Sequence, residues 1–112
     1  MELTIAERVA LSNILPVQSN AATLRIVTDL RMELSFTEEE LEEYGIENKT
    51  LPDGRAIVSW NPEKASETKD FKIGKKATGV IVSELTRLDS RGQLHITMLP
   101  LYEKFVEDRA EP

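Results

Sequence analysis

The sequence predicts a mainly helical α+β domain of about five helices, with a β-hairpin or small antiparallel sheet inserted between the third and fourth helices. Three observations support this class. Residues 21–35 and 75–89 repeat apolar side chains at the helical period. Pro52-Asp53-Gly54 is a turn signal between two short strand-like segments. The prolines, and all but one of the glycines, fall at or near the proposed element boundaries, so the layout is internally consistent.

The chain of 112 residues suits one domain, which we place at residues 1–108, with residues 109–112 as a charged tail that frays. The first helix is predicted to begin after Thr4, because Thr4 and Glu7 fit a capping box, and to run to about Ile14. Pro16 prevents its continuation. Its apolar side is predicted to consist of Ile5, Ala6, Val9 and Ala10.

The second helix is the strongest amphipathic segment of the chain. Ser19 or Asn20 can cap it, because either side chain can accept a hydrogen bond from a free N–H of the first turn. A short acidic helix follows, in which Thr37 and Glu40 fit a second capping box and Gly45 supplies the left-handed residue at the end. The apolar arc of the second helix consists of Leu24, Ile26, Val27, Leu30 and Leu34.

The second half of the chain begins with strands. Residues 46–60 are predicted to form the β-hairpin, whose polar first strand suits a sheet edge. Residues 70–73 are a candidate third strand. Helices are then predicted at 75–89 and at 98–106, the last capped by Thr97. We expect helices 21–35 and 75–89 to pack together as the centre of the core.

Composition limits the classes of function. The net charge of −6 disfavours broad binding to a phosphate backbone, which depends on lysine and arginine. The absence of cysteine excludes disulfides and thiolate chemistry and is compatible with a reducing compartment, so we expect a cytoplasmic location. No apolar run approaches the roughly 18 residues that a membrane span needs, and the N-terminus does not have the pattern of a signal peptide.

No catalytic, cofactor-binding or metal-ligating constellation is visible. His95 is the single histidine, whereas a zinc site needs three or four ligands that are usually histidine or cysteine. The glycine-rich motifs that bind nucleotides are missing. We therefore expect a non-enzymatic protein that needs no cofactor. An enzyme built on carboxylates stays an alternative, and it requires two acidic groups that converge in a cleft.

The acidic segment 38–43 is the candidate surface for a protein partner, although a merely solvated helix face is the simpler alternative. Aromatic residues beside the glutamates would anchor a partner if they are exposed. A homodimer is a further expectation, because Met32 and Val82 are apolar residues outside the core-facing arcs. The candidate partner surface consists of Glu39, Glu42, Glu43, Tyr44 and Trp60.

Two pairs of charged residues are further candidates. Lys75 and Lys76, at the start of a helix, could contact an anion through their ammonium groups and the free N–H groups of the first turn. Glu84 lies within the apolar arc of its helix, and a buried carboxylate must be paired or neutral. We predict an ion pair between Glu84 and Arg31, or Arg25, where the two long helices pack, with a glutamate that reaches solvent as the alternative.

The order of three helices and a hairpin is that of a winged helix, in which the third helix reads the major groove of DNA. Here the third helix, 38–44, is nearly all glutamate and would be repelled by DNA. A nucleic-acid-associated regulator nevertheless stays the alternative to a protein-interaction module. It would require the following lysines to gather on one surface: Lys64, Lys69, Lys72, Lys75 and Lys76.

Four segments together resemble small proteins of unknown function that are encoded in phages and prophages. These segments are TLRIVTDLRMELSFTEEE, VSWNPE, IGKKATGVIVSELTRLDSRGQL and LPLYEKFVED, and the likeness extends from Ala22 to Asp108. The resemblance implies a cytoplasmic protein that acts in an infected bacterial cell, as a phage accessory protein or a factor that binds a host protein. It carries no catalytic residues to transfer.

Overall fold

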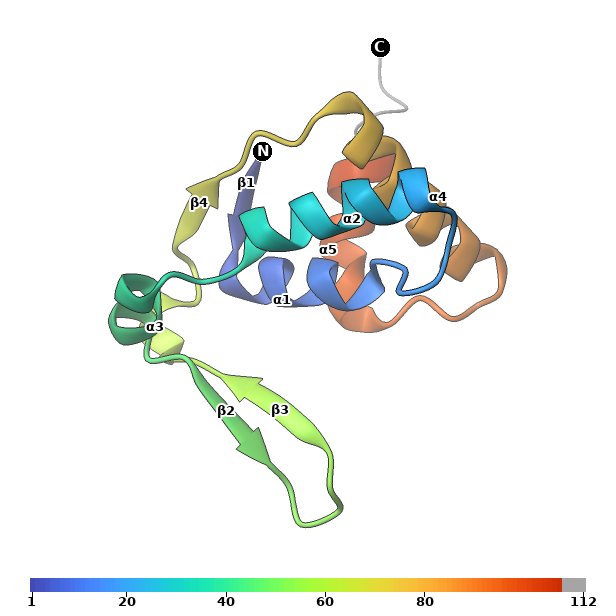
Figure 1. The fold of residues 1–112 in the computed structure, drawn as a ribbon. Coiled ribbons are helices and arrows are strands. Elements are labelled where there is room, and N and C mark those ends of the chain that lie inside the picture. The colour runs from blue at the N-terminus through green and yellow to red at the C-terminus, as the bar shows by residue number, and fades with distance from the viewer. Residues whose placement is uncertain (108–112) are drawn as a thin grey trace.

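The computed structural model describes residues 1–107, and the predicted tail 109–112 lies outside these residues. It confirms the α+β class, with a hairpin between the third and fourth of five α-helices in the described part of the chain (Figure 1). The helices are α1 (Ile5–Ile14), α2 (Ala21–Leu34), α3 (Glu38–Tyr44), α4 (Lys75–Ser90) and α5 (Leu99–Tyr102). The strands are β1 (Glu2–Thr4), β2 (Glu47–Thr50), β3 (Ala56–Ser59) and β4 (Thr68–Asp70).

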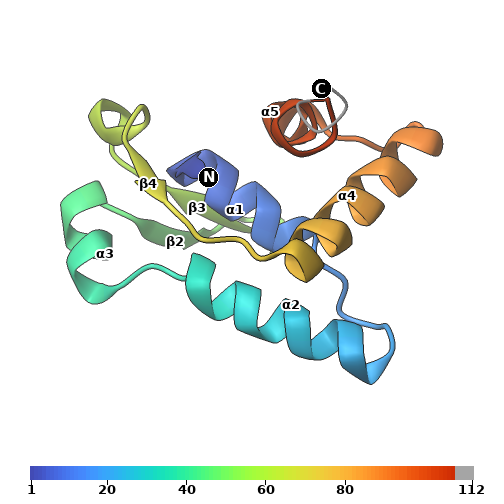
Figure 2. The same ribbon diagram turned by 90° about the horizontal axis from the view of Figure 1, so that it is seen from above.

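Helix α1 occupies the centre of the helical body, with α2, α4 and α5 around it (Figure 2). Helices α2 and α4 pack together as expected, but they do not form the centre alone. The predicted apolar side of α1 was also rotated from the observed one, since Ala6 is exposed and Leu11 is completely buried. The core combines residues of α1, α2, α4 and α5 with Leu3, which lies in β1, and Phe71, which follows β4.

The predicted helix starts depend on local hydrogen bonds, and the structure contains them. The side chains of Thr4, Asn20 and Thr37 each accept a hydrogen bond from the backbone N–H three residues later. Gly45 has a φ of 62°, which places it in the left-handed region at the end of α3. The last helix differs, because His95 rather than Thr97 caps the 3-10 turn Ile96–Met98 that leads into α5.

Within residues 1–107, the strands form two separate antiparallel pairs. Strands β2 and β3 make the predicted hairpin, in which Glu47 lies opposite Ser59. The predicted third strand starts earlier, at Thr68, and pairs with the N-terminal strand β1 instead of extending the hairpin. Strand β1 was not expected, because a three-residue segment has no readable periodicity. The ammonium group of Met1 donates to Asp70 over 2.8 Å beside this pair.

The hairpin projects away from the helical body, as Figure 1 shows. All four residues of β2 and the first three residues of β3 are exposed. Helix α3 connects the hairpin to α2, so the position of α3 decides where the hairpin points. No helix in residues 1–107 is long and apolar enough to cross a membrane.

Candidate functional site

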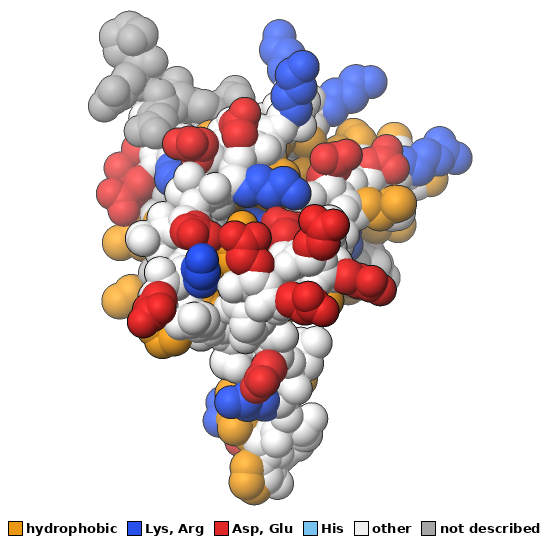
Figure 3. Space-filling view, turned by 90° about the vertical axis from the view of Figure 1, so that its left-hand side faces the viewer, with side chains coloured by type: hydrophobic (Ala, Val, Ile, Leu, Met, Phe, Trp, Pro, Cys, Tyr) orange, Lys and Arg blue, Asp and Glu red, His pale blue; other side chains and the backbone are white. Residues whose placement is uncertain are grey.

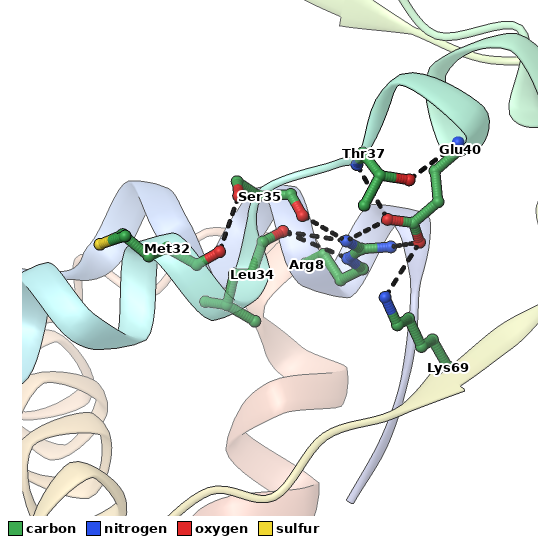
Figure 4. Close-up of polar contacts among 7 residues, drawn as sticks. All are labelled: Arg8, Met32, Leu34, Ser35, Thr37, Glu40 and Lys69. Carbon is green, nitrogen blue, oxygen red and sulfur yellow. Dashed lines mark hydrogen bonds and ion pairs between the residues drawn. The ribbon is translucent and has the colours of Figure 1, made fainter.

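Arg8 is a buried arginine in the middle of α1, and its side chain is 1% exposed. Its Nη1 donates to Glu40 Oε2 over 2.7 Å, and its Nη2 donates to Glu40 Oε1 over 3.3 Å. The same guanidinium donates to the carbonyl oxygens of Leu34 and Ser35 at the end of α2 (Figure 4). Arg8 thus binds one side chain and two backbone carbonyls. These carbonyls lie at the C-terminal end of α2, where no further N–H group of the helix follows to bind them.

Two phenylalanine rings lie against the guanidinium. Its Cζ atom is 3.9 Å from the ring centroid of Phe36 and 5.0 Å from that of Phe71. The flat, weakly hydrated guanidinium favours such positions over aromatic faces. Lys69 of β4 adds a second cation, 3.6 Å from Glu40. We call the set Arg8, Phe36, Glu40, Lys69 and Phe71 the arginine clasp.

Glu40 has two functions in the arginine clasp. Its Oε1 accepts a hydrogen bond from the backbone N–H of Thr37, which completes the capping box of α3, while both carboxylate oxygens bind Arg8. Burial by itself would raise the pKa of Glu40. The hydrogen bonds from Arg8 and Thr37, together with the positive charges of Arg8 and Lys69, instead lower the pKa from 4.5 to about 2.

The stability of the protein should therefore depend on pH through Glu40. A carboxylate whose pKa is lower in the folded state stabilises the fold above its unfolded pKa. We expect the free energy of unfolding to fall as pH is lowered from 4.5 toward about 2, as measured by urea denaturation at each pH. Glu40→Gln should flatten this dependence, whereas the exposed neighbour substitution Glu39→Gln should leave it intact. An unchanged slope in Glu40→Gln would contradict this assignment.

The arginine clasp fixes α3 against α1 and β4, and the hairpin follows directly from α3. At the base of the hairpin, the backbone N–H of Asn61 donates to the carbonyl of Tyr44 over 2.8 Å. This bond joins the segment that enters the hairpin to the segment that leaves it. In residues 1–107, every buried side-chain polar atom has a hydrogen-bond partner. The clasp is therefore a fully satisfied polar network that orients the hairpin.

The hairpin itself presents apolar side chains to solvent. Ile57 is 39% exposed and Val58 is 36% exposed, on opposite faces of β3. Strand β3 has no charged residue, whereas β2 carries Glu47 and Lys49. The turn residue Gly54 has a φ of 88°, and its N–H donates to the carbonyl of Leu51. Such a left-handed glycine after a tight turn is typical of a three-residue hairpin loop with a bulge.

The predicted partner surface is only partly assembled at the surface. Glu39, Glu42 and Glu43 are exposed on α3, and carboxylates gather over this side of the molecule (Figure 3). The prediction that Tyr44 belongs to this surface is wrong. Tyr44 is buried one helical turn after Glu40, on the same inward face of α3. Burial and the neighbouring carboxylates raise the pKa of its hydroxyl. Trp60 is half-buried near the base of the hairpin.

The predicted ion pair between Arg31 and Glu84 is wrong. Glu84 binds Arg87 over 2.6 Å, one turn further along the same helix. Arg31 donates to the carbonyl of Leu15, over 3.1 Å, at the end of α1. Both side chains find a closer partner than each other, and the alternative Arg25 is exposed. The expectation that Val82 is a free apolar residue is also wrong, since it packs against the core.

Lys75 and Lys76 are exposed at the start of α4, where Gly74 provides no side-chain cap. With Lys72 they line one side of a groove of about 380 Å³, and Asp29 and Glu33 of α2 line the other. The groove thus carries both signs of charge. The two remaining lysines of the expected basic surface lie elsewhere, since Lys69 binds Glu40 and Lys64 binds Glu67.

A second buried acidic group lies on α1. Glu7 is 5% exposed and binds Lys104 over 2.8 Å, and Lys104 also donates to the carbonyl of Glu2. This contact holds Glu103–Glu107, the last helical segment of the described residues, against β1 and α1. Among residues 1–107, no cluster of three or more histidine or acidic side chains has a geometry that could hold a metal ion.

The chain has no match among protein-family models, curated proteins or solved structures. The geometry of the arginine clasp and the hairpin is therefore the basis for a proposed function. Sequence reasoning missed Arg8 and treated Glu40 only as a helix cap. One signal was available, because Arg8 lies midway between Ile5 and Leu11, at the spacing of the buried face of α1.

Proposed function

We propose that this protein is a non-enzymatic, acidic protein-interaction module that contacts its partner through the β2–β3 hairpin. The observation that carries the proposal is the exposed position of the hairpin, which the buried arginine clasp holds away from the body (Figure 1). An isolated two-stranded hairpin is only marginally stable in water. A hairpin that is held outward without packing on a core is therefore suited to meet another molecule.

The energetic arrangement supports this role. Moving Arg8 and Glu40 out of water costs several kcal/mol per ion, which their mutual attraction and hydrogen bonds must offset. The hairpin contributes little to the core, since seven of its eight strand residues are exposed. A rigid base reduces the entropy that a binding segment loses on association. By fixing the base of the hairpin, the clasp should reduce the entropy that the hairpin loses when it binds a partner.

The chemistry of the hairpin favours strand addition. In this mode, an extended segment of the partner hydrogen-bonds to a free strand edge, and side chains on both faces provide specificity. Strand β3 has the uncharged sequence Ala56-Ile57-Val58-Ser59, without the lysine or proline that blunts many edge strands.

Affinity capture from a bacterial lysate tests the proposal. The tagged protein should retain a protein partner after nuclease treatment, and Val58→Pro should abolish this capture by removing an N–H from the outer edge of β3. The matched control is Asn48→Pro, which makes the same change on the outer edge of β2 and should leave capture intact. Capture that is equal in both variants would contradict a role for β3, and a wild type that captures no protein would contradict a partner of different sequence.

Nucleic-acid association is the alternative function, and the groove beside Lys72, Lys75 and Lys76 is the feature that favours it. Capture that disappears with nuclease and with added salt would support that alternative. In the order of elements, α3 takes the place of the recognition helix of a winged helix, and its glutamates oppose DNA binding. We also propose that the protein acts in the cytoplasm and is of phage or prophage origin, in line with the sequence resemblance and the lack of cysteine.

A further inference from the structure

We propose that strand β3 pairs antiparallel with β3 of a second copy of this chain, about a two-fold axis at Ile57, to form a four-stranded sheet. This inference rests on the proposed function, since it uses the hairpin as the contact surface and names the partner. The hairpin projects away from the helices, and β3 is its strand nearer the helical body (Figure 1). Among residues 1–107, β3 pairs only with β2, so the outer edge of β3, the side away from β2, has no strand partner. A contact of this kind is isologous and closes on itself.

The hydrogen-bond ladder of the hairpin decides which backbone groups are free. The N–H of Leu51 donates to the carbonyl of Arg55 over 2.8 Å, which makes these two residues a hydrogen-bonded pair. Hydrogen-bonded and non-hydrogen-bonded pairs alternate along an antiparallel ladder. Ile57, opposite Lys49, is therefore bonded within the hairpin. The N–H and C=O groups of Ala56 and Val58 face the outer edge.

A two-fold axis at Ile57 matches these free groups to each other. Ala56 of one copy then lies opposite Val58 of the second copy, and each pair exchanges N–H to O=C hydrogen bonds. Ile57 lies opposite Ile57 of the second copy as a non-hydrogen-bonded pair, in which side chains are closest. A cross-strand pair of β-branched residues stabilises a sheet. Pairing about this axis thus covers the side chain of Ile57, which is 39% exposed in the single chain.

The charge of the hairpin favours a second copy of this chain as the partner of β3. Residues 46–60 contain two acidic residues, Glu47 and Asp53, and two basic residues, Lys49 and Arg55, so the hairpin is neutral in a chain of net charge −6. Two hairpins can therefore approach tip to base without repulsion. In this register Arg55 lies opposite the small Ser59 of the second copy and can reach across it to that copy's Glu47. The outer edge of β2 is less suited to pairing, because the charged side chains of this strand oppose the addition of another strand.

Cysteine cross-linking tests the register, because the native chain has no cysteine. In a non-hydrogen-bonded pair the Cα atoms are about 4.5 Å apart, within the range that a disulfide spans. Ile57→Cys should give a disulfide-linked dimer under mild oxidation. The control is Val17→Cys, whose position is 86% exposed and outside the hairpin, and which should stay monomeric. Equal cross-linking of the two variants would overturn the proposal.

Sedimentation of the purified chain gives an independent readout. The interface is small, so we expect weak association, visible at roughly hundreds of micromolar protein. Val58→Pro should weaken dimerisation about tenfold or more, because it removes two symmetry-related hydrogen bonds, while Asn48→Pro should not change it. A strictly monomeric wild type would overturn self-pairing. If lysate capture still depended on Val58 in that case, the proposed function would stand with a different partner.

Discussion

Arg8→Met is expected to lower the free energy of unfolding by about 3–5 kcal/mol. The arginine is 1% exposed and provides the closest cation to Glu40. Without it, Glu40 keeps the N–H of Thr37 and, as its nearest cation, Lys69 at 3.6 Å, and the carbonyl oxygens of Leu34 and Ser35 lose the guanidinium as a donor. A buried charge without a partner costs far more than the net value of the original pair. Urea denaturation followed by circular dichroism measures the loss.

Two controls separate the loss of this pairing from a general effect of removing an arginine. Arg25→Met removes an exposed arginine and should change stability by no more than about 0.5 kcal/mol. The double variant Arg8→Met/Glu40→Met should recover part of the loss, because it leaves no carboxylate buried without a partner. A cost below about 1 kcal/mol for Arg8→Met would mean that the arginine clasp does not stabilise the fold.

The features that could be predicted from the sequence are those decided over a few residues. The caps at Thr4, Asn20 and Thr37 and the left-handed Gly45 depend on bonds within four residues, so the residue types were sufficient. The hairpin was predictable for the same reason, since its turn and both strands lie in one short segment. Local chemistry thus gave most of the element boundaries.

The candidate site was not predictable, because its parts come together over long sequence distances. Arg8 binds groups that lie 26 to 32 residues away, so the residues beside it in the chain do not identify its partners. Strand β1 pairs with a strand more than sixty residues later. For Glu84 the error was of the opposite kind, since a nearby residue of its own helix, Arg87, replaced the predicted long-range partner.

Leu11→Ala is expected to cost about 2–5 kcal/mol, which tests the central position of α1. Leu11 is completely buried among residues of α1, α2, α4 and α5, although sequence periodicity placed Ala6 rather than Leu11 on the apolar side. Truncation removes the buried methyl groups and leaves a cavity that a packed interior closes only partly. The loss should fall in the same range as that of Leu85→Ala, because both side chains are 0% exposed.

The matched control for this prediction is Val17→Ala, which also removes methyl groups but at a position that is 86% exposed. It should change the free energy of unfolding by no more than about 0.5 kcal/mol in the same urea titration. If Leu11→Ala were as mild as this control while Leu85→Ala were severe, α2 and α4 would form the core and α1 would only cover it. A severe loss in both leucine variants requires α1 at the centre. The arginine clasp, which starts from α1, then holds the hairpin on the most stable part of the fold.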